Sequence, residues 1–185
     1  MADDANSNLI RKNLGLIHLY TGDGKGKTTA AVGLSVRAKA AGLRVLFVQF
    51  LKSGNSAELK ALETLGVEVI SGQPSSKFVF QMDPDEKEIT RVFHEKRLID
   101  AFKATEAGVD LLVLDEILGA IATGMVTEVM LLDFLNNKPK HLEVVLTGRD
   151  PSENILEVSD YVSEVVMRKH PFESSGLSAR KGIEF

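Results

Sequence analysis

Short apolar runs alternate along the chain with segments of helical periodicity. The run at 110–114 has no polar alternation, which is typical of a strand buried on both faces. Strands are predicted at 14–20, 44–51, 67–70, 110–114, 142–147 and 162–167, and helices at 28–41, 57–65, from 83 onward, at 117–122, 128–135 and 152–158. This alternation predicts one α/β domain, in which a parallel sheet carries helices on both faces.

The longest predicted helix begins after Asp83. The Asp83 side chain can accept hydrogen bonds from the first turn, Pro84 suits the first helical position, and Asp85 and Glu86 favour the positive end of the helix dipole. The stripe that we expect this helix to bury consists of the apolar residues Ile89, Val92, Phe93, Ile99 and Phe102.

Composition indicates an ordinary globular chain with one core. Of the 185 residues, 44% are hydrophobic and 26% are charged, and no segment is biased enough to link two domains. We expect one domain over 14–185, preceded by a polar, flexible N-terminal segment at 1–13. The net charge is −4 and the 22 basic residues are scattered, so no nucleic-acid partner is expected.

Neither export nor membrane insertion is expected. The polar start carries acidic residues where a signal peptide would be basic, and no apolar run approaches the length of a membrane span. Because the chain has no cysteine, disulfides and thiolate metal sites are excluded. The sequence therefore favours a cytoplasmic protein with no membrane partner.

The sequence Thr21-Gly-Asp-Gly-Lys-Gly-Lys-Thr28 lies between a predicted strand and a predicted helix, the context in which such a loop binds nucleotide phosphates. Glycines let N–H groups converge on an anion, and the helix start adds unpaired N–H groups. Lys27 can contact phosphate oxygens, and the Thr28 hydroxyl can bind Mg²⁺. A P-loop NTPase-like (RecA-like) fold follows, with ATP held by Gly22, Asp23, Gly24, Lys25, Gly26, Lys27 and Thr28. The alternative is a turn that merely reverses the chain.

A pair of carboxylates, Asp115 and Glu116, follows a buried strand. Ligands of open α/β sheets bind outside the carboxyl ends of the strands, and in P-loop folds an acid at this place holds Mg²⁺. Asp115 and Glu116 are therefore candidate metal ligands together with Thr28. The alternative is that they cap the next helix.

Four further residues are candidates with open alternatives. Lys52 and Arg149 lie just beyond strands and can meet phosphate, but they can equally be solvated. Phe78 and Phe80 lie in a polar loop, where aromatic residues more often pack into the core.

In several motifs the chain resembles the P-loop type of ATP:corrinoid adenosyltransferase. The threonine at position 21, where most phosphate loops have a leading glycine, is also typical of that family. The motifs are Tyr20-Thr-Gly-Asp-Gly-Lys-Gly-Lys-Thr-Thr-Ala30, Val48-Gln-Phe-Leu-Lys52, Gly66-Val-Glu68, Val113-Leu-Asp-Glu116, Thr147-Gly-Arg149, Lys169-His-Pro-Phe172 and Gly182-Ile-Glu-Phe185.

The resemblance implies transfer of the 5′-deoxyadenosyl group of ATP to cobalt(I) of a reduced corrinoid, with release of tripolyphosphate, in adenosylcobalamin synthesis or salvage. It implies that Gly22 to Thr29 hold the triphosphate, with Lys27, Thr28 and Glu116 as catalytic residues. Thr28 and Glu116 would bind Mg²⁺, and Arg37 and Arg149 would line the nucleotide site, so that the full set of nucleotide ligands is Gly22, Asp23, Gly24, Lys25, Gly26, Lys27, Thr28, Thr29, Arg37 and Arg149.

The resemblance also assigns Phe78 and Phe80 to the corrinoid, whose lower axial ligand they would displace, although familiar members have Trp at the second position. It further implies a homodimer and an electron-donor protein, such as a flavodoxin-like reductant. A small P-loop ATPase or kinase is the alternative function, and a non-catalytic sensor of ATP or corrinoid is a third.

Overall fold

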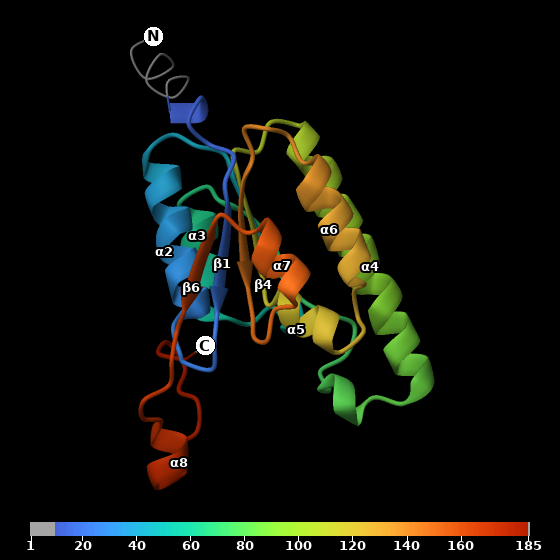
Figure 1. Cartoon of the computed structure of the whole chain (residues 1–185). Helices are drawn as coiled ribbons and strands as arrows, with labels where there is room; N and C mark the ends of the chain where they lie inside the picture. The colour runs from blue at the N-terminus through green and yellow to red at the C-terminus, as the bar shows by residue number, and fades with distance from the viewer. Residues whose placement is uncertain (1–9, 185) are drawn as a thin grey trace.

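The computed structural model describes residues 10–184, which form three layers around a six-stranded sheet (Figure 1). All strand pairs are parallel, in the order β3-β2-β4-β5-β1-β6. The strands are β1 (Ile17–Thr21), β2 (Val45–Gln49), β3 (Glu68–Ile70), β4 (Leu111–Asp115), β5 (Glu143–Thr147) and β6 (Tyr161–Glu164). The prediction of a single α/β, P-loop NTPase-like domain is confirmed.

Helices cover both faces of this sheet, as predicted. Helices α2 and α3 lie on one face, and α4, α6 and α7 lie on the other, while α8 projects beyond the carboxyl edge (Figure 1). The helices are α2 (Lys27–Ala40), α3 (Ala57–Thr64), α4 (Pro84–Glu106), α5 (Ile117–Ala122), α6 (Glu128–Asn137), α7 (Glu153–Val158) and α8 (Pro171–Ser175). None of the helices in the described part of the chain is both long and apolar enough to cross a membrane.

Neighbouring residues of each central strand belong to different cores. In β2, Val45 and Phe47 pack in the core under α2 and α3, whereas Leu46 and Val48 pack in the core under α4 and α6. Because successive strand side chains point to opposite faces, a strand covered on both sides needs apolar residues throughout. Each buried aliphatic side chain contributes about 1.5–3 kcal/mol to burial free energy, which explains the unbroken apolar runs.

The start of α4 agrees with its sequence. The Glu86 N–H donates to Asp83 Oδ1 at 2.9 Å, and the Asp83 N–H donates to Glu86 Oε2 at 3.0 Å. Pro84 occupies the first turn, where a missing N–H costs nothing. This reciprocal capping fixes where the preceding loop ends.

The predicted buried stripe of α4 is wrong. Ile89, Val92, Phe93 and Ile99 are exposed, and only Phe102 of that stripe packs against the core. The residues of α4 that are buried instead are Thr90, His94, Arg97, Leu98, Ala101 and Thr105.

Arg97 provides the physical reason for this orientation of α4. Its guanidinium donates to the carbonyl oxygens of Gln49, Ser71 and Gly72, where the chain leaves β2 and β3. Buried carbonyl groups without a partner are costly, so a polar side chain faces the sheet here. The apolar residues of α4 that periodicity assigned to the core then face outward.

The predicted N-terminal segment, 1–13, falls partly outside the described residues, which begin at Ile10. Within it, Arg11 Nε contacts Asp110 Oδ1 at 2.8 Å, and Arg11 Nη2 contacts Oδ2 at 3.0 Å. Asp110 also accepts a hydrogen bond from the Arg44 N–H at 2.8 Å. The chain just before β1 is therefore tied to the start of β4 by a bidentate ion pair.

His94 is a fully buried histidine on the sheet-facing side of α4. Its ring lies 5.7 Å from the ring of Phe50 and 5.6 Å from that of Phe93, measured between centroids. Neither ring nitrogen has a hydrogen-bond partner within residues 10–184. Burial, aided by the positive charge of Arg97, lowers the pKa of His94 to about 4. The imidazole is therefore neutral at physiological pH.

This burial predicts acid sensitivity. The unfolded chain, in which the pKa of His94 is about 6.5, binds more protons than the folded chain at mildly acidic pH. As the pH falls from about 6.5 towards about 4, His94 alone should remove on the order of 3 kcal/mol from the free energy of unfolding. Urea denaturation at several pH values should show a shallower decline for His94→Leu than for the parent. Ile89→Leu, an exposed change on the same helix at a residue that does not titrate, should keep the parental decline. Equal slopes for all three proteins would contradict this account.

Candidate functional site

The glycine-rich loop lies at the carboxyl end of β1 and packs against the segment after β6. The Gly24 N–H donates to the Val165 carbonyl at 2.7 Å, and the Met167 N–H donates to Asp23 Oδ1 at 2.8 Å. At Gly22, whose φ is 96°, an added Cβ would lie 2.5 Å from the Val165 carbonyl oxygen, and at Gly24 it would lie 2.6 Å from the same atom. Both positions therefore require glycine, because backbone approaches backbone.

The start of α2 offers unpaired N–H groups to an anion. The Ala30 N–H donates to the Gly26 carbonyl at 2.8 Å, while the N–H groups of Lys27, Thr28 and Thr29 have no partner in the part of the chain that the structure describes. The first turn contains no acidic side chain that could compete for them. These groups, together with the helix dipole, form a site for a phosphate group.

Lys27 lies across the loop. Its Nζ donates to the carbonyl oxygens of Gly22 at 2.7 Å and Gly24 at 2.8 Å. Burial lowers the pKa of Lys27, and the charge of Arg149 lowers it further, while Glu116 opposes both effects. Two cations therefore repel each other here, and an anion bound between them would relieve that repulsion.

The carboxylate of Asp115, at the end of β4, is fully buried and joins several elements. Its Oδ1 accepts hydrogen bonds from the hydroxyls of Thr28 at 2.9 Å and Thr147 at 2.8 Å. Its Oδ2 accepts hydrogen bonds from Gln49 Nε2 at 3.2 Å and Lys52 Nζ at 2.6 Å. Asp115 therefore fixes the phosphate-loop threonine relative to β2, β4 and β5.

Glu116 differs from Asp115 in having a free carboxylate. Its backbone has φ of 63°, and its N–H donates to Thr147 Oγ1 at 2.8 Å, but its carboxylate makes no hydrogen bond or ion pair within residues 10–184. Burial raises the pKa of Glu116, and the charge of Asp115 raises it further. A metal ion would stabilise such a carboxylate.

The oxygen donors predicted for Mg²⁺ are close to one another. Thr28 is hydrogen-bonded to Asp115, and Glu116 follows directly. Among the described residues, no group of three or more His, Cys, Asp or Glu side chains could hold a metal alone. Mg²⁺ commonly takes one or two carboxylates, with substrate phosphates and water as its other ligands. The donor set therefore fits an ion that binds together with ATP.

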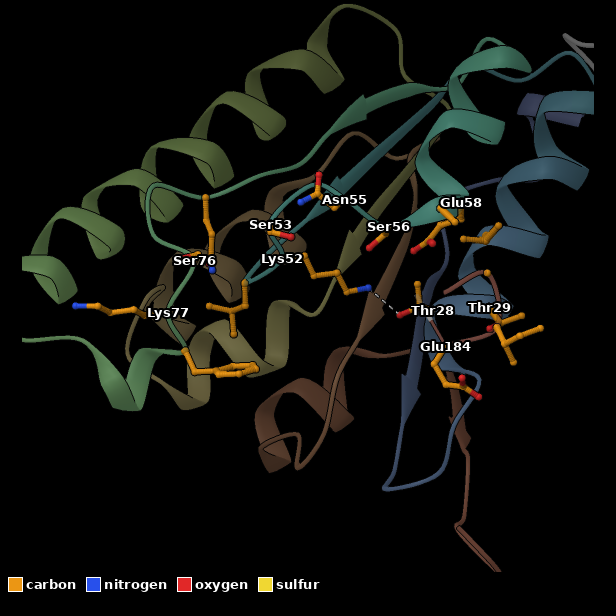
Figure 2. A pocket seen from close by; sticks show the side chains of 17 residues that line it. Thr28, Thr29, Lys52, Ser53, Asn55, Ser56, Glu58, Ser76, Lys77 and Glu184 are labelled. Carbon is orange, nitrogen blue, oxygen red and sulfur yellow. Dashed lines mark hydrogen bonds between the residues drawn. The ribbon is translucent and has the colours of Figure 1, made fainter. Parts of the chain in front are cut away.

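A cavity of about 810 Å³ lies between the start of α2 and the loop after β3 (Figure 2). Thr28 and Thr29 line its phosphate-loop side, and Ser76 lines the opposite side. Phe78 also lines the cavity. Its volume suits a ligand of nucleotide size. Further polar residues from the segment after β2 also line the cavity: Ser53, Asn55, Ser56 and Glu58.

Phe78 and Phe80 form an exposed aromatic pair. They lie in the loop predicted at 71–82, which contains one turn of 3₁₀-helix, η1 (Val79–Gln81). The two rings are stacked, with centroids 5.6 Å apart, and the residues are 69% and 80% exposed. The alternative that they pack into the core is therefore wrong. Their rings offer a flat apolar surface beside the cavity.

The remaining predicted nucleotide ligands lie in different places. Arg149 follows β5 and is near enough to Lys27 and Glu116 to perturb the pKa of each. Arg37 is exposed in the last turn of α2, about 15 Å along the helix axis from Lys27, so the fold does not bring it to the phosphate loop. Lys25 Nζ forms an ion pair with Glu184 at 3.1 Å and is directed to the C-terminal segment.

Several residues of the site lie in the motifs quoted above but were assigned no role from the sequence. Gln49 and Thr147 hydrogen-bond to Asp115, and Ile183 and Glu184 line the cavity. Gln49 and Thr147 are buried polar residues that end otherwise apolar strands, and this pattern is a signal that sequence reading could have used. The two C-terminal residues carried no comparable physical signal.

The fold and the loop define a P-loop nucleotide-binding protein, since the loop joins β1 to α2 and its threonine contacts the acid of β4. Comparison with known proteins gives the family. Residues 13–185 match the model of the family described as ATP:corrinoid adenosyltransferase BtuR/CobO/CobP, and the chain belongs to this family. The resemblance predicted from the motifs is thereby confirmed, and the protein is a transferase.

Individual members are similar over most of their length. The corrinoid adenosyltransferase CobA of Salmonella typhimurium is 33% identical over 187 residues, which cover 98% of this chain and 91% of that protein. The corrinoid adenosyltransferase of Escherichia coli K12 is 33% identical over 92% of this chain and 86% of its own length. That of Pseudomonas aeruginosa is 30% identical over 95% of this chain.

The free carboxylate of Glu116 yields a prediction about magnesium. Glu116→Gln removes a charged oxygen ligand while keeping the side-chain shape, so ATP binding should require about tenfold more Mg²⁺. Calorimetric titration of ATP at a series of Mg²⁺ concentrations measures this requirement. Glu63→Gln, an exposed change on α3, should leave the magnesium dependence at the parental value. Superimposable curves for all three proteins would mean that Glu116 does not bind the ion.

Proposed function

We propose that the chain transfers the 5′-deoxyadenosyl group of ATP to cobalt(I) of a reduced corrinoid and releases tripolyphosphate, in the synthesis or salvage of adenosylcobalamin. Family membership supports the substrates. The structural observation that carries the proposal is the cavity, which is lined both by Thr28 and Thr29 of the phosphate loop and by Phe78 of the exposed aromatic pair. One space thus serves a nucleotide and a large second substrate.

The proposed reaction needs no general base. The cobalt(I) electron pair forms the cobalt–carbon bond to C5′, the C5′–oxygen bond breaks, and triphosphate leaves with that bond's electron pair, so cobalt becomes formally cobalt(III). The protein must hold the two reactants in line and stabilise the leaving group. The second task is assigned in this proposal to Lys27, Arg149 and the free N–H groups of α2, and their positions at the phosphate loop support it.

Mg²⁺ held by Thr28, Asp115 and Glu116 would neutralise part of the charge on the triphosphate. The two carboxylates lie near three cations, Lys27, Lys52 and Arg149, so this edge of the sheet has only a small excess of positive charge before ATP binds. A polyphosphate without a cation would disturb that balance, because its charges would face Asp115 and Glu116. This explains why a metal ion and the nucleotide are expected to bind together.

The aromatic pair is proposed to contact the corrinoid and displace its lower axial ligand. Phe78 and Phe80 are held by the start of η1, where the Phe78 N–H donates to Gln81 Oε1 at 3.1 Å. Their exposure leaves an apolar surface that a macrocycle can cover. Loss of the axial ligand would make cobalt(II) easier to reduce.

A homodimer and an electron-donor protein, such as a flavodoxin-like reductant, complete the proposal. An edge strand that is exposed along its length supports a second copy: all four residues of β6 are exposed, including Tyr161 and Val162. Multi-angle light scattering tests the dimer, and reduction of bound cobalt(II) by purified flavodoxin tests the donor.

An ATPase or kinase remains the second candidate, favoured by the unpaired carboxylate of Glu116, which could orient water or an acceptor. Incubation with ATP, Mg²⁺ and chemically reduced cobalamin separates the two. Adenosyl transfer yields a light-sensitive alkylcobalt spectrum and one tripolyphosphate for each alkylated corrinoid, whereas ADP and phosphate mean hydrolysis or phosphoryl transfer.

Lys27→Ala should slow adenosyl transfer about 100-fold, as for other preorganised donors, while Lys60→Ala, an exposed change on α3, should not.

The aromatic pair predicts a defect that depends on the cobalt state. Phe78→Ala and Phe80→Ala should abolish most activity that starts from cobalt(II) and a protein reductant, but should cost much less when cobalt(I) is supplied. Thermal unfolding should change little, because both residues are exposed. Truncation of a buried phenylalanine to alanine would instead cost about 3–5 kcal/mol of stability. Val129→Ala, an exposed apolar change on α6, is the control. Equal damage with both cobalt states, or a large loss of stability, would refute the displacement role.

A further inference from the structure

The ammonium group of Lys52 lies between two of the oxygen atoms predicted to bind the metal. Its Nζ is 2.6 Å from Asp115 Oδ2 and 3.4 Å from Thr28 Oγ1. Figure 2 shows the side chain extending across the cavity to Thr28. A cation of this protein thus occupies the place between a carboxylate and a hydroxyl that would suit Mg²⁺.

The backbone after β2 supports this placement. The Phe50 N–H donates to the Asp115 carbonyl at 2.9 Å, which keeps the chain beside β4, and Leu51 then adopts φ of 56°. A non-glycine residue seldom takes this left-handed conformation, which the surrounding structure must maintain. The strained turn at Leu51 leads directly to Lys52, whose ammonium contacts Asp115.

Electrostatics explains why the pair exists. The carboxylate of Asp115 is fully buried, and a buried charge without a partner is strongly unfavourable. Within residues 10–184, Lys52 is the one side-chain cation in ion-pair contact with it. Mg²⁺ at the same oxygens would repel the ammonium, so the two cations cannot both remain there.

We propose that Lys52 is an exchangeable counter-ion. It neutralises Asp115 while no nucleotide is bound, yields these oxygens to Mg²⁺ when MgATP enters, and then binds the triphosphate. Lys52 lines the same cavity as Thr28 and Thr29, and its flexible stem lets the ammonium move without the backbone. The inference rests on the proposed MgATP site and not on adenosyl transfer.

The proposal predicts opposite changes in two affinities. In Lys52→Met, Mn²⁺ alone should bind about tenfold more tightly, because its competitor is gone. MnATP should bind at least about tenfold more weakly, because a charge-assisted contact to phosphate is lost. The electron paramagnetic resonance signal of free Mn²⁺ measures the first affinity, and calorimetry with ATP at saturating Mn²⁺ measures the second.

Two control variants test whether the charge at this position matters. Lys52→Arg keeps the cation and should restore most of both parental values. Lys60→Met alters an exposed lysine on α3 that does not line the cavity, and it should change neither affinity. An unchanged Mn²⁺ affinity in Lys52→Met, or a shift of both affinities in the same direction, would overturn the exchange.

If Lys52→Met fails to fold because Asp115 is left unpaired, a second comparison remains. Asp115→Asn removes the buried charge, and the double variant Lys52→Met/Asp115→Asn then removes the cation without creating an unpaired carboxylate. The double variant should bind MnATP at least about tenfold more weakly than Asp115→Asn. Equal affinities would mean that Lys52 contacts Asp115 but does not bind the triphosphate, which would overturn the exchange. No measurement uses a corrinoid, so failure of adenosyl transfer would leave these results intact.

Discussion

The carboxylate of Asp115 imposes the constraint around which the carboxyl edge of the sheet is organised. A buried carboxylate is tolerated only when hydrogen-bond donors and a cation surround it, since its transfer from water is otherwise very costly. The donors come from α2, from the ends of β2 and β5, and from the turn after β2. The apolar strands accordingly end in polar residues at Gln49 and Thr147, and the phosphate loop keeps a fixed position relative to the acids.

Much of the fold and part of the site follow from the sequence by simple geometry. Continuous apolar runs require strands covered on both faces, and the glycine loop requires a strand before it and a helix after it. Parallel strands place their carboxyl ends at one edge, which is why Thr28 and the acidic pair could be expected to meet without knowledge of strand order. The order itself, with β5 between β1 and β4, depends on packing between elements distant in sequence.

The remaining features depend on hydrogen-bonding and ligand-binding requirements, which a pattern of hydrophobic residues does not show. In α4, Arg97 faces the sheet because carbonyl groups of other segments lack partners there, and the apolar side chains turn outward. From residue type alone, Phe78 and Phe80 were expected to pack into the core, but both are exposed. Residue type cannot distinguish an aromatic residue of the core from one that binds a ligand. Arg37, by contrast, could have been judged remote from the phosphate loop from the rise of an α-helix alone.

The phosphate loop, near the N-terminus, contacts the segment just after β6, which is synthesised much later. The loop is made early on the ribosome, but its partner carbonyl at Val165 and its partner amide at Met167 emerge more than a hundred residues later. Until β6 has paired with β1, the contacts of Lys27 with Gly22 and Gly24 are present, but the backbone of Val165 that packs against both glycines is not. A chain that ends before β6 therefore lacks the backbone contacts that hold Asp23 and Gly24 in the folded protein.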